Sequence, residues 1–200
     1  MGADRSLQII EASRAGANVD AAALSLAGMP MASSDPVSGE LEGWQFVCGE
    51  GPSLDAYALN TTAGCPDTSL AHGRWTGLGH AVGSWPFRAV FAFPVTHGSA
   101  TLGALTLYRM DPGPLTSWES AVADNWAAEA ARWLGESLLD ESHPAVGYDQ
   151  FDLLHRAVGV LMGQTGVSAD TATATIRARA LDTHRDLARV VADILDFRSF

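Results

Sequence analysis

The stretch HRAVGVLMGQTGVS, residues 155–168, determines how the C-terminal quarter of the chain is expected to fold. Val158, Leu161 and Met162 continue a helical spacing that starts at Leu154, so the stretch predicts a helix with one buried face. Gly159 and Gly163 interrupt this helix, although each glycine costs about 1 kcal/mol relative to alanine. Gly159 alone is explained equally well by a neighbouring helix that crosses closely. We expect the apolar stripe to hold a helical bundle together, and we expect the two glycines to lie where another backbone approaches closely.

Two further helices are predicted after this one. Gly166 is placed to end the first helix and Ser168 to cap the second. Apolar residues then recur at helical spacing over 169–182 and over 185–196. They predict a small three-helix bundle over residues 148–200, with these buried positions: Phe151, Leu154, Val158, Leu161, Met162, Ala172, Ile176, Ala180, Leu187, Val190, Val191 and Ile194.

The preceding residues, 1–140, predict a domain of a different kind. Residues 86–110 alternate as two strands around a turn at His97–Gly98–Ser99, and residues 20–36 form a second pair of strands. Helices are expected over 6–17, in two pieces over 37–60, weakly over 69–81, and over 115–140. Thr116 and Glu119 have the spacing of a capping box for the last helix. Residues 141–147, which contain Pro144, form the linker to the bundle.

Charge is unevenly distributed along the chain. The formal net charge is −11, and all twelve basic residues are arginines. Residues 1–147 carry sixteen acidic residues and six arginines. Residues 148–200 carry seven acidic residues and six arginines. The acidic front does not favour nucleic acid or anionic membrane, so the C-terminal segment is the better candidate for either. The lack of lysine excludes a P-loop and a phospho-acceptor receiver domain.

Catalytic and metal-binding patterns are not found in the sequence. The six histidines are scattered, and no nucleophile elbow, HExxH motif or paired Cys/His spacing occurs. Cys48 and Cys65 are interpreted as reduced thiols. We therefore expect no enzyme, no metal and no cofactor. With neither a signal peptide nor an apolar run of membrane-spanning length, we expect a soluble cytoplasmic protein without a membrane partner.

The polar residues of the bundle suggest a nucleic-acid surface. Arginine grips phosphate with a planar fork and stacks on bases, so several arginines beside a glycine-thinned helix favour RNA. We expect phosphate contacts from the arginines and base contacts from histidine or glutamine. The predicted RNA-binding residues are His155, Arg156, Gln164, Arg177, Arg179, His184, Arg185 and Arg189.

Residues 148–200 resemble the ANTAR domain, a three-helix RNA-binding antiterminator module. The resemblance is carried by these residues: Ala157, Gly159, Leu161, Met162, Gly166, Ser168, Ala172, Ile176, Arg177, Ala180, Leu187, Val190 and Ile194. It implies binding to a leader transcript with two small stem-loops, which stabilises an antitermination structure. Two positions depart from the family. Val158 stands where lysine is frequent, and Asp186 stands where a basic residue is frequent, so positive charge is missing there.

Residues 5–140 resemble a GAF domain of the kind fused to ANTAR. The resemblance rests on GEGPSLDAY (49–57), DPVSGELEGWQF (35–46) and FPVTHGSATLGALTLY (93–108), and Ser53 replaces a frequent cysteine. It implies an α+β sensor: a GAF-like antiparallel sheet flanked by helices, with Phe91, Phe93 and Leu105 in its core. Trp44, Trp75 and Trp85 are candidates to line a pocket for an unknown small molecule, although core packing is the better explanation for each.

The leading hypothesis is a signal-responsive antitermination regulator that binds RNA as a homodimer. A small-molecule or protein signal would act on residues 1–140, and the helix over 115–140 would pass the change to the bundle. The alternative is a protein-interaction or dimerisation module whose RNA binding is weakened or lost. A DNA-binding helix-turn-helix and a thiol enzyme are two further alternatives, although the Ala/Thr-rich second helix has little with which to read a major groove.

Overall fold

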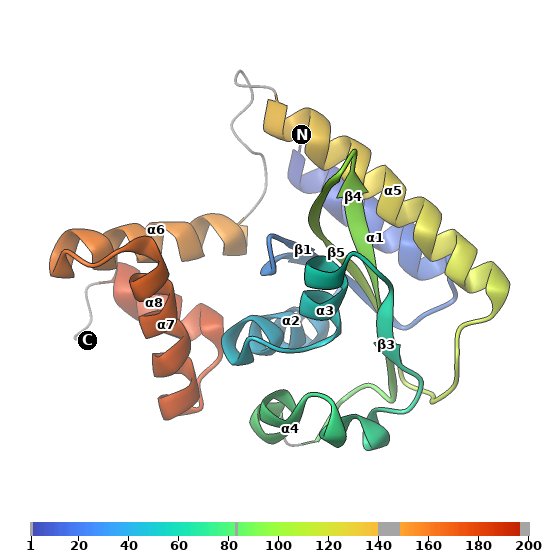
Figure 1. Ribbon diagram of the computed structural model, residues 1–200, viewed down its shortest axis with the longest axis horizontal. Coiled ribbons are helices and arrows are strands. Elements are labelled where there is room, and N and C mark those ends of the chain that lie inside the picture. The colour runs from blue at the N-terminus through green and yellow to red at the C-terminus, as the bar shows by residue number, and fades with distance from the viewer. Residues whose placement is uncertain (1, 83, 140–148, 197–200) are drawn as a thin grey trace.

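The computed structural model describes residues 2–82, 84–139 and 149–196 (Figure 1). The linker expected over 141–147 lies outside these residues. The N-terminal part is built on one antiparallel sheet of five strands in the order β2-β1-β5-β4-β3. Its strands are β1 (Ala21–Leu26), β2 (Met29–Ser33), β3 (Ala63–Cys65), β4 (Ala89–His97) and β5 (Ala100–Arg109). Both hairpins that the sequence predicts are present, β1–β2 and β4–β5.

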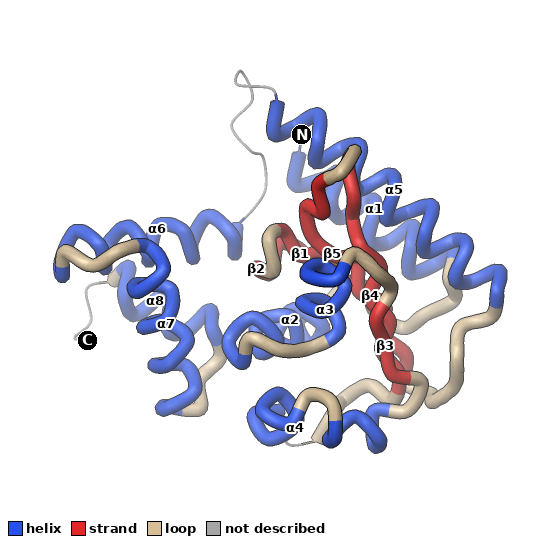
Figure 2. The backbone as a smooth tube through the Cα atoms, viewed as in Figure 1, coloured by secondary structure: helices blue, strands red, loops and turns tan. Residues whose placement is uncertain are grey.

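Helices cover both faces of this sheet, as Figure 2 shows. Helices α1 (Gly2–Gly16) and α5 (Ser117–Leu139) cover one face, and α2 (Pro36–Cys48) and α3 (Pro52–Leu59) cover the other. Side chains alternate accordingly along β5, because successive residues of a strand point to opposite faces. Leu105 and Leu107 face α1 and α5, whereas Tyr108 faces α2. The α+β, GAF-like architecture expected from the sequence is confirmed.

Local sequence explains most helix ends. Asp35 caps α2 by accepting hydrogen bonds from the backbone N–H groups of Val37 and Ser38, and Gly49 ends it with φ 74°. Thr116 and Glu119 form the predicted capping box at the start of α5. The expected weak helix over 69–81 is instead a 3₁₀ helix, η1 (Thr68–Gly73), and a short α4 (Thr76–Val82). The break places the buried Trp75 in the core between them.

The C-terminal part consists of three helices, as predicted. They are α6 (Asp149–Thr165), α7 (Ala169–Thr183) and α8 (Leu187–Leu195). Gly166 follows α6 with φ 72°, and Ser168 caps α7 through its hydroxyl. The buried stripe includes Leu154, Val158 and Leu161. Met162 was expected in this stripe, but it is 39 % exposed because it lies at the edge of the apolar face.

The bundle packs against the outer side of α2, opposite the sheet. Trp44, Phe46 and Val47 of α2 belong to one continuous hydrophobic cluster with Leu154, Ile176 and Val191 of the bundle. In Figure 1 the three C-terminal helices accordingly lie on the α2 side of the sheet, and α1 and α5 lie on the far side. Helix α2 is therefore buried on two sides, and it joins the two parts of the molecule together with β2, which contacts α6. Of the expected sheet core, Phe93 and Leu105 are fully buried and Phe91 is half-buried.

Candidate nucleic-acid interface

The outer face of α6 is open. Arg156, Gly159 and Gly163 lie on the side of the helix opposite the buried stripe, and all three are exposed. A Cβ atom built at either glycine meets no atom within 4 Å. Within the described residues, therefore, no crossing helix accounts for Gly159. Arg156 forms no ion pair with any residue in the described part of the chain, so its guanidinium is available for an external anion.

The junction between α7 and α8 gathers three more of the predicted residues. His184 ends α7 in the left-handed conformation, and its Nδ1 lies 2.9 Å from the carbonyl oxygen of Leu181. Arg185 pairs with Asp193, and the hydrogen bond to this carboxylate raises the pKa of Arg185. Arg189 is exposed and pairs with Asp186, with 3.4 Å between Nε and Oδ2. Each arginine here is held by an acidic neighbour, which an incoming phosphate would have to displace.

Asp186 also has a structural role that explains why this position is acidic. Its Oδ1 accepts a hydrogen bond of 2.8 Å from the backbone N–H of Arg189, which caps α8. Val158, the other departure from the family pattern, is 9 % exposed and belongs to the bundle core. At both positions the residue present makes a contact that stabilises the bundle.

Arg177 points away from solvent and toward the N-terminal part. Its Nε donates to the carbonyl oxygen of Val47 at 3.1 Å, and its guanidinium lies 5.4 Å from the ring centre of Phe46. The cation thus sits at the C-terminal end of α2, where unpaired carbonyl groups make the helix end negative. Gly49 makes room for it, because a Cβ atom at Gly49 would lie 2.1 Å from Nη2 of Arg177.

The eight predicted residues do not converge on one spot in this arrangement. His155, Arg156 and Gln164 are exposed on α6, Arg179 is exposed on α7, and His184, Arg185 and Arg189 lie at the α7–α8 junction. Arg177 is turned onto the N-terminal part, and His184 lines a cavity with residues of α2 and α4. The predicted residues therefore fall mainly in two regions of the bundle, the outer face of α6 and the α7–α8 junction.

The three tryptophans considered for a ligand pocket lie in one buried cluster. Trp75 is 2 % exposed, and its Nε1 donates to Asp55 at 3.0 Å, which is a packing role. Trp85 is 9 % exposed, and its Nε1 has no hydrogen-bond partner among the described residues. Trp44 lines a shallow cavity of about 410 Å³ together with His184 and residues of α2 and α4. Ser53 is buried and bonds to Gln45 through its backbone N–H and its hydroxyl.

The surroundings of Cys48 do not activate its thiol. Burial, with a smaller contribution from Glu50, raises the pKa of the Cys48 thiol to about 11. A thiol with such a pKa is a poor nucleophile at neutral pH. Among the described residues no cluster of His, Cys, Asp and Glu could hold a metal ion. Nor does any helix of the described part combine the length and hydropathy needed to cross a bilayer.

Comparison with protein families decides the identity of the C-terminal part. Residues 149–195 match the ANTAR domain family. These residues form an ANTAR domain. The domain implies an RNA-binding antitermination regulator, and its three helices coincide with α6, α7 and α8. A search of curated proteins returned no match.

Solved structures identify the fold of the N-terminal part. The GAF domain of a phosphoenolpyruvate-protein phosphotransferase from Acinetobacter is similar with a TM-score of 0.53 and 14 % identity, over 70 % of this chain and 86 % of that one. A domain assigned to a two-component sensor histidine kinase from Sinorhizobium meliloti 1021 gives a TM-score of 0.52 and 17 % identity, over 66 % and 90 %. The part that precedes the ANTAR domain therefore has a GAF-like fold.

Sequence reasoning missed two features of this region. The docking of Arg177 on α2 depends on residues 130 positions apart, and no local pattern announces such a pair. The cap formed by Asp186 was detectable in principle, because aspartate before an apolar helical run is a typical N-cap.

Proposed function

We propose that this protein is a signal-responsive transcription antitermination regulator that binds stem-loops of nascent RNA through its ANTAR domain. The GAF-like domain receives a small-molecule or protein signal, and the protein acts as a homodimer because two stem-loops suit two bundles. RNA is bound by the outer face of α6 and the α7–α8 junction. Because nascent transcripts are its target, we place the protein in the cytoplasm.

The observation that carries this proposal is the open glycine face of α6. Gly159 and Gly163 weaken an exposed helix, and no group of the described chain contacts the space beside them. The two glycines lower the stability of the helix and make room for no other group of the described chain. We therefore infer that they make room for a partner molecule that approaches the helix closely. Arg156 beside the glycines supplies a cation that suits a phosphate backbone.

The test is direct binding of the full chain to a synthetic RNA with two adjacent stem-loops, titrated against salt. We expect binding that weakens steeply as salt rises, because phosphate neutralisation releases counterions. Arg156→Ala should weaken binding by about 1 kcal/mol or more and lower the salt slope by about one contact. Arg14→Ala is the control, since it removes a partly exposed arginine from α1, outside the ANTAR domain. Equal effects of the two variants, or equal affinity for a scrambled strand, would contradict the proposal.

A second candidate function is a protein-interaction module. The same open face of α6 also suits a partner helix, because glycines let two helix backbones approach closely. In that case Arg156→Ala would leave partner binding nearly intact, whereas an alanine or larger side chain at Gly159 would abolish it. Duplex DNA that competes better than structured RNA would instead favour a DNA-binding function.

A further inference from the structure

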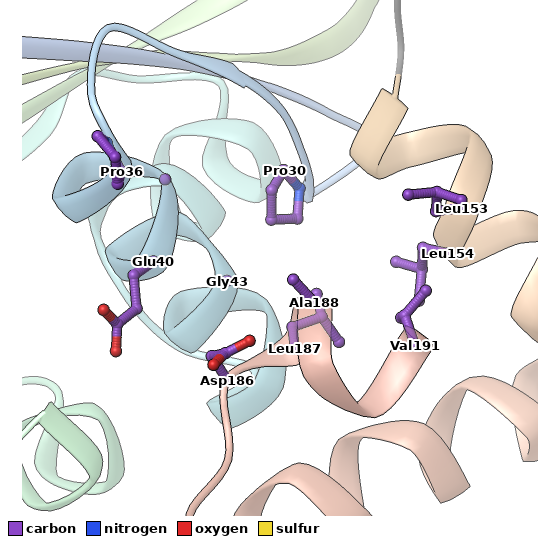
Figure 3. A pocket seen from close by; sticks show the side chains of 11 residues that line it. Pro30, Pro36, Glu40, Gly43, Leu153, Leu154, Asp186, Leu187, Ala188 and Val191 are labelled. Carbon is purple, nitrogen blue, oxygen red and sulfur yellow. The ribbon is translucent and has the colours of Figure 1, made fainter. Parts of the chain in front are cut away.

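A cavity of about 260 Å³ lies between the GAF-like domain and the ANTAR domain (Figure 3). Pro30 of β2 and Glu40 of α2 contribute to one side, and Leu154 of α6 and Leu187 and Val191 of α8 contribute to the other. It lies on the outer side of α2, at the edge of the sheet of the GAF-like domain, where Pro30 of β2 lines it. Neither domain encloses this space without the other.

Two glycines of α2, Gly39 and Gly43, line the cavity. A Cβ atom at Gly39 would lie 2.7 Å from Oγ of Ser33, so this glycine allows the close packing of α2 against β2. A Cβ atom at Gly43 would lie 3.6 Å from the Cβ of Leu187, which is ordinary contact and leaves no room for a longer side chain. The close packing of Gly43 against Leu187 therefore forms one edge of the cavity. The cavity itself is the unfilled space next to this contact.

The size and walls of the cavity define the ligand. A cavity of ~150 Å³ lined by Leu, Ile and Phe binds benzene, and drug-sized ligands take roughly 300–1,000 Å³. This cavity therefore suits a single small ring or a short branched chain. Proline, leucine and valine side chains make up most of its wall, so the body of the ligand is apolar.

Charge at the cavity selects the polar end of the ligand. Glu40 and Asp186 both line it, and no arginine, lysine or histidine does so among the described residues. Glu40 accepts one bond from Nε1 of Trp44 at 3.3 Å. Asp186 caps α8 through Oδ1, and its Oδ2 lies 3.4 Å from Nε of Arg189, so Glu40 is the less compensated of the two carboxylates. A carboxylate offers about four acceptor positions, so both retain capacity for a further donor. Figure 3 shows the two carboxylates toward the α2 side and Leu153 and Leu154 across from them.

We propose that this interdomain cavity is a binding site for a small apolar molecule that carries an ammonium group. The apolar body fills the space between Pro30 and Val191, and the ammonium donates to Glu40 and Asp186. Because its walls come from two domains, the ligand binds the docked arrangement in preference to the separated one and so stabilises it. The effect of the ligand on RNA binding rests on the proposed function, whereas the binding site itself does not.

Three matched probes test the site on the full chain: benzylamine, benzyl alcohol and benzoate. Methyl groups of Leu153, Leu154, Leu187 and Val191 report binding in NMR titrations. We expect benzylamine to shift these methyl signals and to bind about two- to five-fold more tightly than benzyl alcohol, as a partly exposed ion pair allows. Benzoate should bind most weakly, because the two carboxylates repel it.

Two kinds of variant separate the charge from the walls. Glu40→Gln combined with Asp186→Asn, which keeps the α8 cap, should bring benzylamine to the affinity of benzyl alcohol. Ala188→Phe should fill the cavity and abolish binding of both probes. Asp124→Asn, an exposed change on α5, is the control and should leave both affinities unchanged.

The outcomes are decisive without any RNA measurement. Benzoate binding as tightly as benzylamine, shifts confined to methyl groups elsewhere, or no shifts with any probe would overturn the site. The charge variants keep the walls intact, so they test the proposal even if Ala188→Phe does not fold. A protein that binds benzylamine as expected but no RNA would uphold the site while contradicting the proposed function.

Discussion

At the scale of single residues, Glu42 is the most unusual side chain of the GAF-like domain. It is 2 % exposed and faces the sheet from α2. The Tyr108 hydroxyl donates to its Oε1 at 2.6 Å and Nε2 of Gln45 donates at 3.1 Å, but no cation pairs with it among the described residues. Burial therefore raises the pKa of the Glu42 carboxyl, even though these hydrogen bonds lower it.

The raised pKa predicts how stability depends on pH. The folded protein holds the Glu42 proton more tightly than the unfolded chain, whose ordinary pKa is 4.5. Its contribution to stability is therefore fully present below pH 4.5 and is lost as pH rises toward the raised value. Glu42→Gln keeps an acceptor without the charge, so we expect it to stabilise the protein at pH 8 by roughly 1–3 kcal/mol relative to wild type, and much less at pH 4.5.

Chemical denaturation at both pH values measures this difference. Glu40→Gln is the matched control, because Glu40 is exposed on the same helix and should show no such pH-dependent gain. Loss of stability in Glu42→Gln at pH 8 would mean that the charged carboxylate is well compensated in the folded protein.

Among the elements, α6 has a well-buried apolar face and an exposed face on which two glycines lower the stability of the helix. Gly159→Ala and Gly163→Ala place a methyl group in open space, so each should stabilise the bundle by about 1 kcal/mol. The same methyl groups should weaken RNA binding, because they stand where the RNA backbone approaches. Thermal unfolding and RNA titration of the same variants measure the two effects. Unchanged RNA affinity with increased stability would remove the outer face of α6 from the interface.

Helix α8 offers a second prediction at this scale, since its first turn depends on one aspartate. Asp186→Ala should destabilise the protein by about 1 kcal/mol through loss of the cap, whereas Asp186→Asn should cost much less. Both variants remove a negative charge beside Arg189, so both should bind RNA more tightly than wild type at low salt. Denaturant titration separates the two variants, and tighter binding by only one of them would show that charge is not the cause.

Most elements could be predicted from sequence because their signals are local. The hairpin around Gly98, the capping box of Thr116 and the stop at Gly166 all depend on residues within a few positions of each other. The segment 69–81 could not be predicted correctly, because its break is set by Trp75, which inserts into a core built from distant helices. Met162 was wrongly predicted to be buried for a related reason. Helical spacing identifies the apolar face of α6, but it does not show how much of that face the neighbouring helices cover.

At the scale of the whole molecule, the sequence predicted two domains but not that they share a core. The residues that join them, such as Val47 and Val191, look like ordinary core residues of separate domains. Which of the RNA-face arginines would turn inward could not be predicted either. Arg177 and Arg179 are both arginines of α7, yet the former contacts α2 and the latter is exposed. Only the docked geometry distinguishes them.

This pair of arginines gives a matched test of docking. Arg177→Ala removes the hydrogen bond to Val47 and the contact with Phe46, so we expect it to destabilise the docked arrangement by about 1–2 kcal/mol. Arg179→Ala removes the same charge from the same helix and should leave docking intact. Small-angle scattering of the full chain measures docking, and its radius of gyration should increase for Arg177→Ala alone.

RNA titration of the same two variants then relates docking to function. If RNA binds the docked arrangement, Arg179→Ala should lower affinity and Arg177→Ala should have little effect, because Arg177 is already engaged by α2. If RNA binds the undocked bundle instead, Arg177 is both a contact of the docked state and a cation of the RNA face. Its removal would then promote undocking and weaken the complex at once, so the salt slope would fall while the radius of gyration rises. We expect the pattern in which Arg179→Ala lowers RNA affinity and Arg177→Ala has little effect. The Arg177 guanidinium interacts favourably with the C-terminal end of α2, so it remains there unless a signal changes the docking.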